Sequence, residues 1–413
     1  MPEPEIESAP ARPIVVMKFG GTSVADASAR SAVTRRVLAA IEVGKAPIVV
    51  VSAMGRSGAP YATDTLLGLL EGLPEDLRER DLIASCGETI AAVVLAHELR
   101  AHGADAHAFT GADAGIATDG VPGAASVTEV YPAPLRTSIA RGEVPVVCGF
   151  QGVAPDGHIT TLGRGGSDTT ACTLGVALEA ESVEIFTDVD GVMTADPRAC
   201  DGASVLTTIR ADELFQMARH GTRVVHTPAA ELALASGLSV RVRNTFSGHD
   251  GTLVADITAY RPDRVASAVS HACDIARLSV ALSAAEGTPA HMAAQARVYR
   301  AMADAGVSLD MFTPVGSQLL FTVPEHFVDS ALGVLRRLSL DCTVRRGLAK
   351  VTLIGAGMHG VPGVMARVAE CLAEAGVVVL QTADSHTTIS VLVDAGDAAP
   401  AVTALHDGFG LAE

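Results

Sequence analysis

The sequence predicts an α/β fold in which a mostly parallel, open sheet is sandwiched by helices, followed by a smaller domain that is repeated. Between Ile14 and about Val254, short β-branched runs alternate with longer helical patterns, which is typical of a parallel sheet covered on both faces. Two glycine-rich segments, 18–23 and 163–168, each follow a strand-like run and lead into a helical one. In the C-terminal third of the chain, one pattern occurs twice at a constant offset.

We expect five strands in the first part, at Ile14–Lys18, Ile48–Ser52, Val146–Gly149, Val183–Thr187 and Ser239–Arg243. The longest helix is predicted from Asp76 to His102, because apolar residues recur there every three to four positions and Gly103 can end it. Ligands of open α/β sheets bind at the carboxyl ends of the strands. Four strands are expected to bring polar or glycine residues to that edge: Lys18, Ser52, Gly149 and Thr187–Asp188.

The repeat near the C-terminus indicates two copies of one small unit. Ala303–Val307 (ADAGV) recurs as Ala373–Val377 (AEAGV), and each copy reads as strand, helix, strand, strand, helix. Such a unit leaves a sheet face or edge uncovered, which favours side-by-side docking of the copies or dimerisation. The expected domains are a disordered lead-in (1–13), a main α/β domain (14–260) and the two copies (266–340 and 341–413).

Composition restricts the classes of protein to be considered. The formal charge of −17 argues against nucleic acid or acidic membranes as partners, and no apolar run appears long enough to span a bilayer. The seven cysteines are odd in number and contain no C-x-x-C pair, so their spacing indicates neither a disulfide framework nor a zinc site. A reducing cytoplasm fits this pattern best.

The two glycine-rich segments are interpreted as two halves of one anion-binding site. Backbone N–H groups at a helix start carry partial positive charge, and glycine lets that backbone approach an oxyanion closely. Lys18 and Arg164 add full positive charges beside them. The chain has no G-x-x-x-x-G-K-[ST] sequence, which excludes the commonest ATP cradle.

A G-x-G-x-x-G pattern at Gly355–Gly360 is interpreted as a tight turn between a strand and a helix. No acidic residue follows at the end of a next strand, and Pro362 lies at the expected helix start, which argues against a dinucleotide site. A pocket for an amino-acid effector at this turn remains an alternative.

Six motifs together resemble the successive motifs of aspartate kinases: KFGGTSV (18–24), VVSAMG (50–55), SCGE (85–88), GFQG (149–152), TTLGRGGSDTTA (160–171) and FTDVDGVMTADPR (186–198). The repeated C-terminal pattern is similar to the tandem ACT domains that regulate that family. The stretch RSGAPYATDTLL after Gly55 and the stretch at 383–389 look most like single-function, diaminopimelate- or lysine-responsive forms. The resemblance implies ATP-dependent phosphorylation of the L-aspartate β-carboxylate, the first step toward lysine, diaminopimelate, threonine and methionine.

This chemistry requires no general base, because the β-carboxylate is already ionised at neutral pH. It requires positive charge and N–H donors around the transferring phosphoryl group. The resemblance therefore implies that Lys18 is the transition-state cation and that Gly20 and Gly21 lie against the transferred phosphate. Asp168 is expected to organise the charged centre without acting as a base. Mg²⁺ is expected to be held mainly by the ATP phosphates, with no protein side chain as a metal ligand.

The resemblance also implies the contacts of the two substrates. The aspartate contacts would be Thr22, Ser23, Ser52, Glu88, Arg164, Gly165, Gly166 and Ser167. Arg164 can grip the α-carboxylate and Glu88 can accept the α-ammonium. The nucleotide contacts would be Lys18, Phe19, Gly20, Gly21, Thr187, Asp188, Asp190, Met193, Asp196, Pro197, Arg198 and Arg223. Where the family pattern has Lys and Pro, this chain has Arg223 and Thr227, so nucleotide affinity is expected to differ. His226 is interpreted as a packing residue.

Three alternatives stay open at this point: a kinase of the same fold that acts on another small acid, a non-catalytic amino-acid sensor, and a nicotinamide dehydrogenase built on Gly355. The expected partners are aspartate, ATP, an amino-acid effector at the C-terminal copies (lysine, threonine or diaminopimelate) and further subunits of a homo-oligomer. The sequence leaves open which effector binds, how many subunits assemble and whether a separate tail-only product exists.

Overall fold

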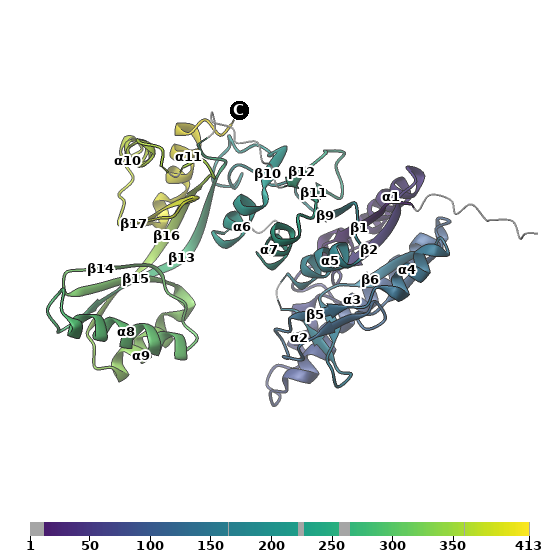
Figure 1. Ribbon diagram of the computed structural model, residues 1–413, viewed down its shortest axis with the longest axis horizontal. Coiled ribbons are helices and arrows are strands. Elements are labelled where there is room, and N and C mark those ends of the chain that lie inside the picture. The colour runs from purple at the N-terminus through teal and green to yellow at the C-terminus, as the bar shows by residue number, and fades with distance from the viewer. Residues whose placement is uncertain (1–11, 164, 222–226, 256–264, 359, 413) are drawn as a thin grey trace, which may run out of the picture. The chain divides into compact units, whose positions relative to one another are not determined.

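The computed structural model describes residues 12–163, 165–221, 227–255, 265–358 and 360–412 (Figure 1). The chain divides into two compact units. The first unit contains Met1–Val192, Val205–Ala218 and Arg223–Thr258, and the second contains Met193–Ser204, Arg219–Thr222 and Ala259–Glu413. Two short segments from within the expected main domain thus belong to the second unit. The domain bounds inferred from the sequence remain a prediction.

The first unit is built on an eight-stranded sheet with the order β10-β12-β11-β9-β1-β2-β6-β3. Its strands are β1 (Ile14–Phe19), β2 (Ala46–Val51), β3 (Ala106–Phe109), β6 (Val144–Cys148), β9 (Ser182–Thr187), β10 (Thr208–Arg210), β11 (Val240–Asn244) and β12 (Thr252–Ala255). Neighbours pair in parallel except β11 and β12, which are antiparallel. The predicted fold class is confirmed, and all five predicted strands lie within two residues of their expected bounds.

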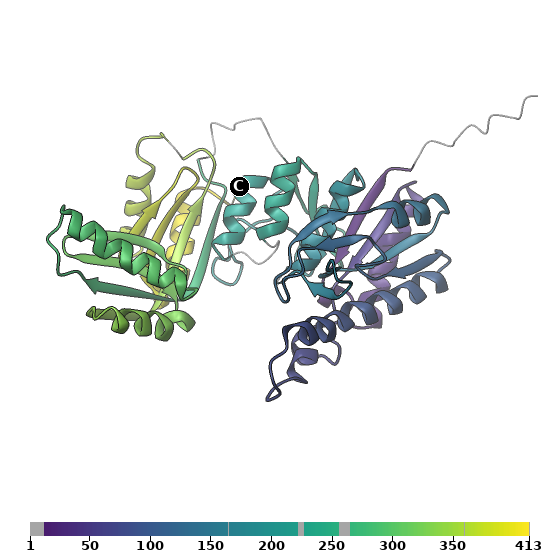
Figure 2. The ribbon, with the colours of Figure 1, turned by 60° about the horizontal axis from the view of Figure 1, so that its bottom comes forward.

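Helices cover both faces of this sheet (Figure 2). The helices are α1 (Ala27–Glu42), α2 (Thr63–Gly68), α3 (Leu77–Ala101), α4 (Ala133–Ala140), α5 (Gly166–Ala177), α6 (Ala211–Arg219) and α7 (Thr227–Ser236). Residues of β1, β2 and β6 share one buried core with α1 and α3. Alternate residues such as Val16, Ile48 and Val50 are fully buried toward the opposite face, where α5 contacts β1, β2 and β9.

The central helix α3 begins at its predicted position because the Asp76 carboxylate accepts hydrogen bonds from the Arg78 and Glu79 N–H groups. By length and composition it is the one described helix that could cross a membrane, yet half of its apolar window is buried inside the protein. Leu95 and Leu99 have no exposed surface and pack in the core of the first unit. We therefore interpret α3 as a core helix.

A small four-stranded sheet, in the order β5-β4-β7-β8, was not predicted, and its strand β8 contacts α3. Its strands are β4 (Ile116–Thr118), β5 (Val127–Val130), β7 (Gln151–Val153) and β8 (Ile159–Thr161). The chain leaves β6 for β7 just after Cys148 and returns from β8 just before the glycine-rich segment at 163. Strands β7 and β8 of this sheet therefore hold the segment between the end of β6 and the start of α5 in position.

The second unit contains a six-stranded sheet with the order β14-β15-β13-β16-β18-β17. The strands are β13 (Ala268–Ala281), β14 (Asp310–Val315), β15 (Gln318–Pro324), β16 (Cys342–Ile354), β17 (Gln381–Asp384) and β18 (Thr388–Asp394). The helices are α8 (Pro289–Asp304), α9 (Val328–Arg337), α10 (Val364–Glu374) and α11 (Ala398–Gly408). Each copy thus has the predicted order of strand, helix, strand, strand, helix.

The two copies are joined by an exchange of strand halves. The long strands β13 and β16 pair antiparallel along the second unit (Figure 1). Residues 277–280 of β13 pair with 342–345 of β16, which completes the sheet of the first copy, whereas 268–272 pair with 350–354, which completes that of the second. Register shifts near Ile275 separate the two halves. The copies therefore dock side by side within one chain and share a continuous sheet.

Each copy in the second unit has its own core, and a smaller cluster of Met311, Leu348 and Leu392 joins strands of both copies. One of the two main cores includes residues from much earlier in the chain. The first copy packs α8 and α9 on β13 and β15 around Phe321, while the second packs α10 and α11 on β16 and β18. Ala195 and Cys200, from the Met193–Ser204 segment, are buried in this second core. The Gly355–Gly360 pattern lies in the turn between β16 and α10, and β16 pairs only antiparallel, which fits the tight-turn interpretation.

Candidate active site

The two glycine-rich segments meet at an ion pair. Lys18 lies near the end of β1 and Asp168 in the first turn of α5, and Lys18 Nζ is 2.6 Å from Asp168 Oδ1. Only 13% and 10% of their side chains are exposed. A lysine ammonium this buried needs an anionic partner, and the Asp168 carboxylate offsets part of the cost of burying its charge at the sheet edge. Arg164, predicted beside them, lies outside the described residues.

Close backbone packing explains the glycines that follow Lys18. The Gly55 N–H donates to the Gly21 carbonyl at 2.9 Å, and a Cβ on Gly21 would come within 2.4 Å of the Gly55 carbonyl oxygen and 2.7 Å of that of Ala53. Gly20 has space, with the Lys18 ammonium as the nearest atom to its hypothetical Cβ. The turn at Gly21–Ser23 can thus lie against the loop after β2 only without a side chain at position 21.

The helix start at α5 is shaped in a similar way. Gly165, the residue before the helix, has a φ of +68°, which favours glycine, and a Cβ on Gly166 would lie 2.8 Å from the Phe150 ring. Ser167 lies against Gly149, where a Cβ would be 2.7 Å from the Ser167 hydroxyl. The N-terminus of α5 therefore comes close to the carboxyl end of β6, as expected for an anion-binding edge.

Glu88 lies on the buried face of α3, with 2% of its surface exposed. Its Oε1 accepts a hydrogen bond from the Ala53 N–H at 3.0 Å, immediately after Ser52, while its Oε2 has no hydrogen-bond partner among the described residues. Burial raises the pKa of the Glu88 carboxyl to about 7, although the bond from Ala53 opposes the shift. A buried carboxylate oxygen without a donor is a ready partner for a cationic group.

These groups line one cavity of about 450 Å³. Eight of the predicted residues line it: Lys18, Gly21, Ser52, Glu88, Gly165, Gly166, Ser167 and Asp168. Thr22 and Ser23 do not line it. Ser23 is fully buried, and its hydroxyl is 2.7 Å from that of Thr245. The cavity therefore combines a paired ammonium, a helix start and a buried carboxyl, which together can hold a zwitterion beside an anion.

Asp81 lines the same cavity and was missed from the sequence. It is 2% exposed, and its carboxylate accepts hydrogen bonds from the Gly123 N–H and from both the N–H and the hydroxyl of Thr161. Asp81 thereby holds the end of β8, just before the glycine-rich segment at 163, against α3. The partners of Asp81 are more than forty positions away in the sequence, so no local sequence pattern indicated that Asp81 belongs to the site.

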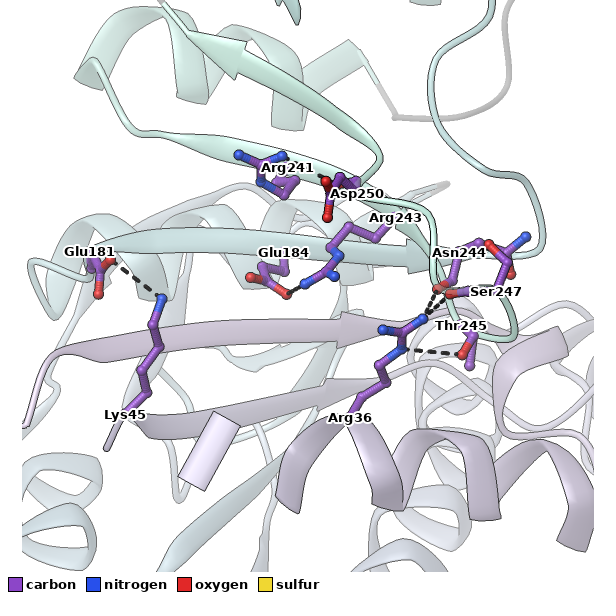
Figure 3. A network of polar contacts seen from close by, with 10 residues as sticks. All are labelled: Arg36, Lys45, Glu181, Glu184, Arg241, Arg243, Asn244, Thr245, Ser247 and Asp250. Carbon is purple, nitrogen blue, oxygen red and sulfur yellow. Dashed lines mark hydrogen bonds and ion pairs between the residues drawn. The ribbon is translucent and has the colours of Figure 1, made fainter. Parts of the chain in front are cut away.

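The predicted nucleotide segment begins at the end of β9 and is supported by the loop after β11. Asp190 Oδ1 accepts hydrogen bonds from Asn244 Nδ2 at 2.8 Å and from the Ser247 hydroxyl at 2.5 Å, and these bonds lower the pKa of the Asp190 carboxyl. Figure 3 shows Arg36 reaching from α1 to the same loop, where it donates to the carbonyls of Asn244, Thr245 and Ser247. The Asp190 carboxylate is thus engaged in holding this loop.

The other predicted nucleotide residues have varied surroundings. Asp188 pairs with Arg56 at 2.6 Å, and both are exposed. Phe19 is fully buried and stacks on Phe186 with ring centroids 4.7 Å apart, so its side chain belongs to the core. Met193, Asp196, Pro197 and Arg198 lie in the second unit, where Arg198 pairs with Asp196 at 2.6 Å. Arg223 and His226 lie outside the described residues, and Thr227 is the first residue of α7.

Comparison with known proteins defines the class. Residues 13–244 match the amino acid kinase family, and residues 343–407 match the ACT domain. The chain therefore belongs to the amino acid kinase family.

Proteins that match nearly the whole chain show which group within this family the chain belongs to. The chain is 42% identical over 407 residues to aspartokinase 1 of Bacillus subtilis, covering 97% of this chain and 100% of that protein. It is 37% identical to an aspartokinase of Mycolicibacterium smegmatis, with 96% of both chains covered. The crystal structure of E. coli aspartokinase III with aspartate and ADP superimposes with a TM-score of 0.79 at 26% identity, covering 96% of this chain and 99% of that one. Within the amino acid kinases, the chain belongs to the aspartokinases.

Proposed function

We propose that this protein transfers the γ-phosphoryl group of MgATP to the β-carboxylate of L-aspartate and releases 4-phospho-L-aspartate. The observation that carries this proposal is the cavity in which the Lys18–Asp168 pair and the unpartnered Glu88 oxygen lie together. One region supplies charge for a phosphoryl group, and the other accepts an ammonium. An amino-acid carboxylate as nucleophile fits both.

Lys18 neutralises the charge that develops on the transferring phosphoryl group. Asp168 holds the Lys18 ammonium in place and does not remove a proton, because the attacking carboxylate is already ionised. Gly20 and Gly21 allow backbone to approach the phosphate, and Phe19 contributes through its main chain. Catalysis on this proposal is the positioning of two anions with compensation of their charge.

Aspartate is bound through its α-ammonium and its α-carboxylate, which leaves the β-carboxylate free to react. Glu88 Oε2 accepts the α-ammonium, and Arg164 binds the α-carboxylate in a two-pronged contact. Ser52 lines the cavity next to Ala53, whose N–H donates to Glu88, and this supports the proposal that Ser52 orients the substrate. The remaining proposed aspartate contacts are Thr22, Ser23, Gly165, Gly166 and Ser167, of which Thr22 and Ser23 act from outside the cavity lining.

ATP is proposed to bind along the carboxyl ends of β9 and β11. The side chains assigned to it, besides those of the first glycine-rich segment, are Thr187, Asp188, Asp190, Met193, Asp196, Pro197, Arg198 and Arg223. Asp190 acts there by shaping the loop that Asn244 and Ser247 complete. Mg²⁺, bound mainly by the phosphates, would supply further charge neutralisation.

We further propose feedback control by an amino acid bound to the ACT copies, in a cytoplasmic homo-oligomer. The structure of E. coli aspartokinase III with lysine and aspartate, at a TM-score of 0.78 and 26% identity, is a complex of that protein with both amino acids. An effector changes activity only through different affinities for two states. If a chain ending after residue 265 still responded fully to lysine, threonine or diaminopimelate, the tail would not be the sensor.

The activity is tested by trapping the acyl phosphate with hydroxylamine. Aspartate hydroxamate should form with aspartate and MgATP, and the Lys18→Ala variant should form almost none. ADP release with glutamate, carbamate or UMP in place of aspartate tests the alternative of another small acid as substrate. Equal or faster release with one of these compounds would refute aspartate as the substrate.

A further inference from the structure

The fold brings together three possible metal ligands that are far apart in the sequence. The Cys200 thiol, a ring nitrogen of His406 and a carboxylate oxygen of Asp407 all lie within 4.8 Å of one another. Cys200 belongs to the Met193–Ser204 segment, whereas His406 and Asp407 lie in α11, and all three are part of the second unit. Cys200 and His406 are buried, while 66% of the Asp407 side chain is exposed, so the cluster lies under the surface with one open side.

The His406 ring is oriented in the way that metal-binding histidines usually are. Its Nε2 is 2.9 Å from the Thr194 hydroxyl, and that hydroxyl also accepts a hydrogen bond from the Ser204 N–H at 3.0 Å. A hydrogen bond on one ring nitrogen fixes the ring and leaves the other nitrogen available to a metal. The available nitrogen, Nδ1, is the one that faces Asp407.

The spacing of the donor atoms suits a small tetrahedral ion better than a direct bond between the side chains. His406 Nδ1 and Asp407 Oδ1 are 3.4 Å apart, which is long for a charge-assisted hydrogen bond. Two N or O ligands on a tetrahedral zinc ion, at their usual bond lengths, are separated by roughly 3.3 Å. Gly202 borders these atoms, since its hypothetical Cβ would lie 3.6 Å from Nδ1 and 3.9 Å from Oδ1, in ordinary contact with both.

The segment that carries Cys200 is held in position by its own contacts. The Thr403 hydroxyl of α11 donates to the Ala199 carbonyl at 3.1 Å, and the Cys200 N–H donates to the Asp196 carbonyl at 3.0 Å. The ligand-bearing turn and the helix are therefore connected independently of any ion. A preformed arrangement of this kind reduces the ordering cost of binding.

We propose that Cys200, His406 and Asp407 form a binding site for a thiophilic divalent cation of the zinc type, with water as the fourth ligand. A thiolate and an imidazole in one site favour zinc over magnesium or calcium. On binding, the sulfur–metal bond forms as the Cys200 thiol loses its proton to solvent, while His406 binds as the neutral ring and Asp407 as the carboxylate. This site is separate from the active-site cavity, whose lining contains none of these residues.

The test uses the full-length protein freed of metal with a chelator and titrated with Co²⁺, then with Zn²⁺ in competition. The expected result is one ion per chain with thiolate-to-cobalt charge-transfer absorption, lost on addition of Zn²⁺. Cys200→Ser should abolish this absorption, and Asp407→Asn should weaken cobalt binding by roughly tenfold or more. Cys342→Ser, at a half-buried cysteine that packs against the core of the first copy, is the control and should bind as the parent does.

A second cluster separates this site from weak surface binding. Asp105, His107 and Glu143 also lie close together in the first unit but offer no sulfur, so His107→Ala should leave the charge-transfer absorption unchanged. Absence of the absorption in the parent protein, or its persistence in Cys200→Ser, would overturn the proposal. Should Cys200→Ser fail to fold, the exposed Asp407→Asn variant decides, and unweakened cobalt binding by it would likewise refute the site.

Discussion

At the scale of single residues, the ionisation of Glu88 links substrate binding to pH. Burial raises the pKa of its carboxyl from 4.5 to about 7. Between these two pH values, the folded protein without substrate holds a proton on Glu88 that the unfolded chain has released. The associated stability is fully present below pH 4.5 and is lost as the pH rises through about 7. A bound α-ammonium would offset this loss by pairing with the ionised form.

We therefore predict that Glu88→Gln, whose side chain cannot ionise, abolishes the part of the pH dependence of stability and of aspartate binding that comes from Glu88. Between about pH 4.5 and 7, the free energy of unfolding of the parent should fall relative to that of the variant. In kinetics, the KM of the parent for aspartate should decrease as the pH rises through about 7, whereas the variant should show a high KM throughout. Denaturant unfolding and initial rates across this range measure both effects, and parallel pH profiles for the two proteins would contradict the prediction.

The second prediction at this scale concerns Lys18. Removal of its ammonium in Lys18→Ala should lower kcat by about 100-fold or more, because the charge compensates the transition state. Lys45→Ala is a control, since Lys45 also pairs with a carboxylate, that of Glu181, at 3.3 Å, and these two residues directly precede β2 and β9 (Figure 3). Steady-state rates should show no change for Lys45→Ala, and an equal loss in both variants would show that the effect is structural.

How far the sequence predicts the site depends on how each residue reaches it. Lys18, Asp168 and Glu88 lie in recognisable motifs, and the geometry does bring them to one cavity. Asp81 depends on tertiary hydrogen bonds from distant backbone, and the Cys200–His406 contact depends on how a loop packs on the last helix. Neither leaves a local pattern in the sequence, so the spacing of the cysteines gave no sign that Cys200 lies close to His406.

At the scale of elements, the contact between the turn after β1 and the loop after β2 sets the shape of the active site. We predict that Gly21→Ala lowers the free energy of unfolding by about 1–3 kcal/mol, because its Cβ meets two backbone carbonyls. The variant should also lose most of the activity. Gly68→Ala is the control, since its Cβ would have no neighbour closer than 4.0 Å. Chemical unfolding and the hydroxamate assay measure the two effects, and a fully active, fully stable Gly21→Ala protein would disprove the packing argument.

Elements with a strong sequence signal were the easiest to predict. Buried parallel strands are continuous apolar runs, so β1, β2 and β9 were found almost to the residue. The small sheet β5-β4-β7-β8 was missed because its strands are three or four residues long and mixed in polarity. The repeat indicated both copies, but not that each would complete the sheet of the other, since this depends on a long strand bending near Ile275.

At the scale of the whole molecule, the exchanged strand halves make the two copies depend on each other. We predict that a chain ending after residue 340 loses protection of those backbone amides at 277–280 that face β16, while the amides that face β15 stay protected, because β15 still pairs with the same residues. Hydrogen exchange measures this, with the amides of β1 in the first unit as an internal reference. Unchanged protection at 277–280 would mean that the first copy is complete without its neighbour.

The burial of Ala195 and Cys200 in the core of the second copy matters for any attempt to use the two C-terminal copies on their own. A polypeptide that starts after about residue 265 would carry every strand of the six-stranded sheet and yet expose an apolar recess where these two side chains belong. A fusion of these copies to another enzyme as a sensor must therefore include the segment Met193–Ser204, or a designed segment whose apolar side chains fill the same recess.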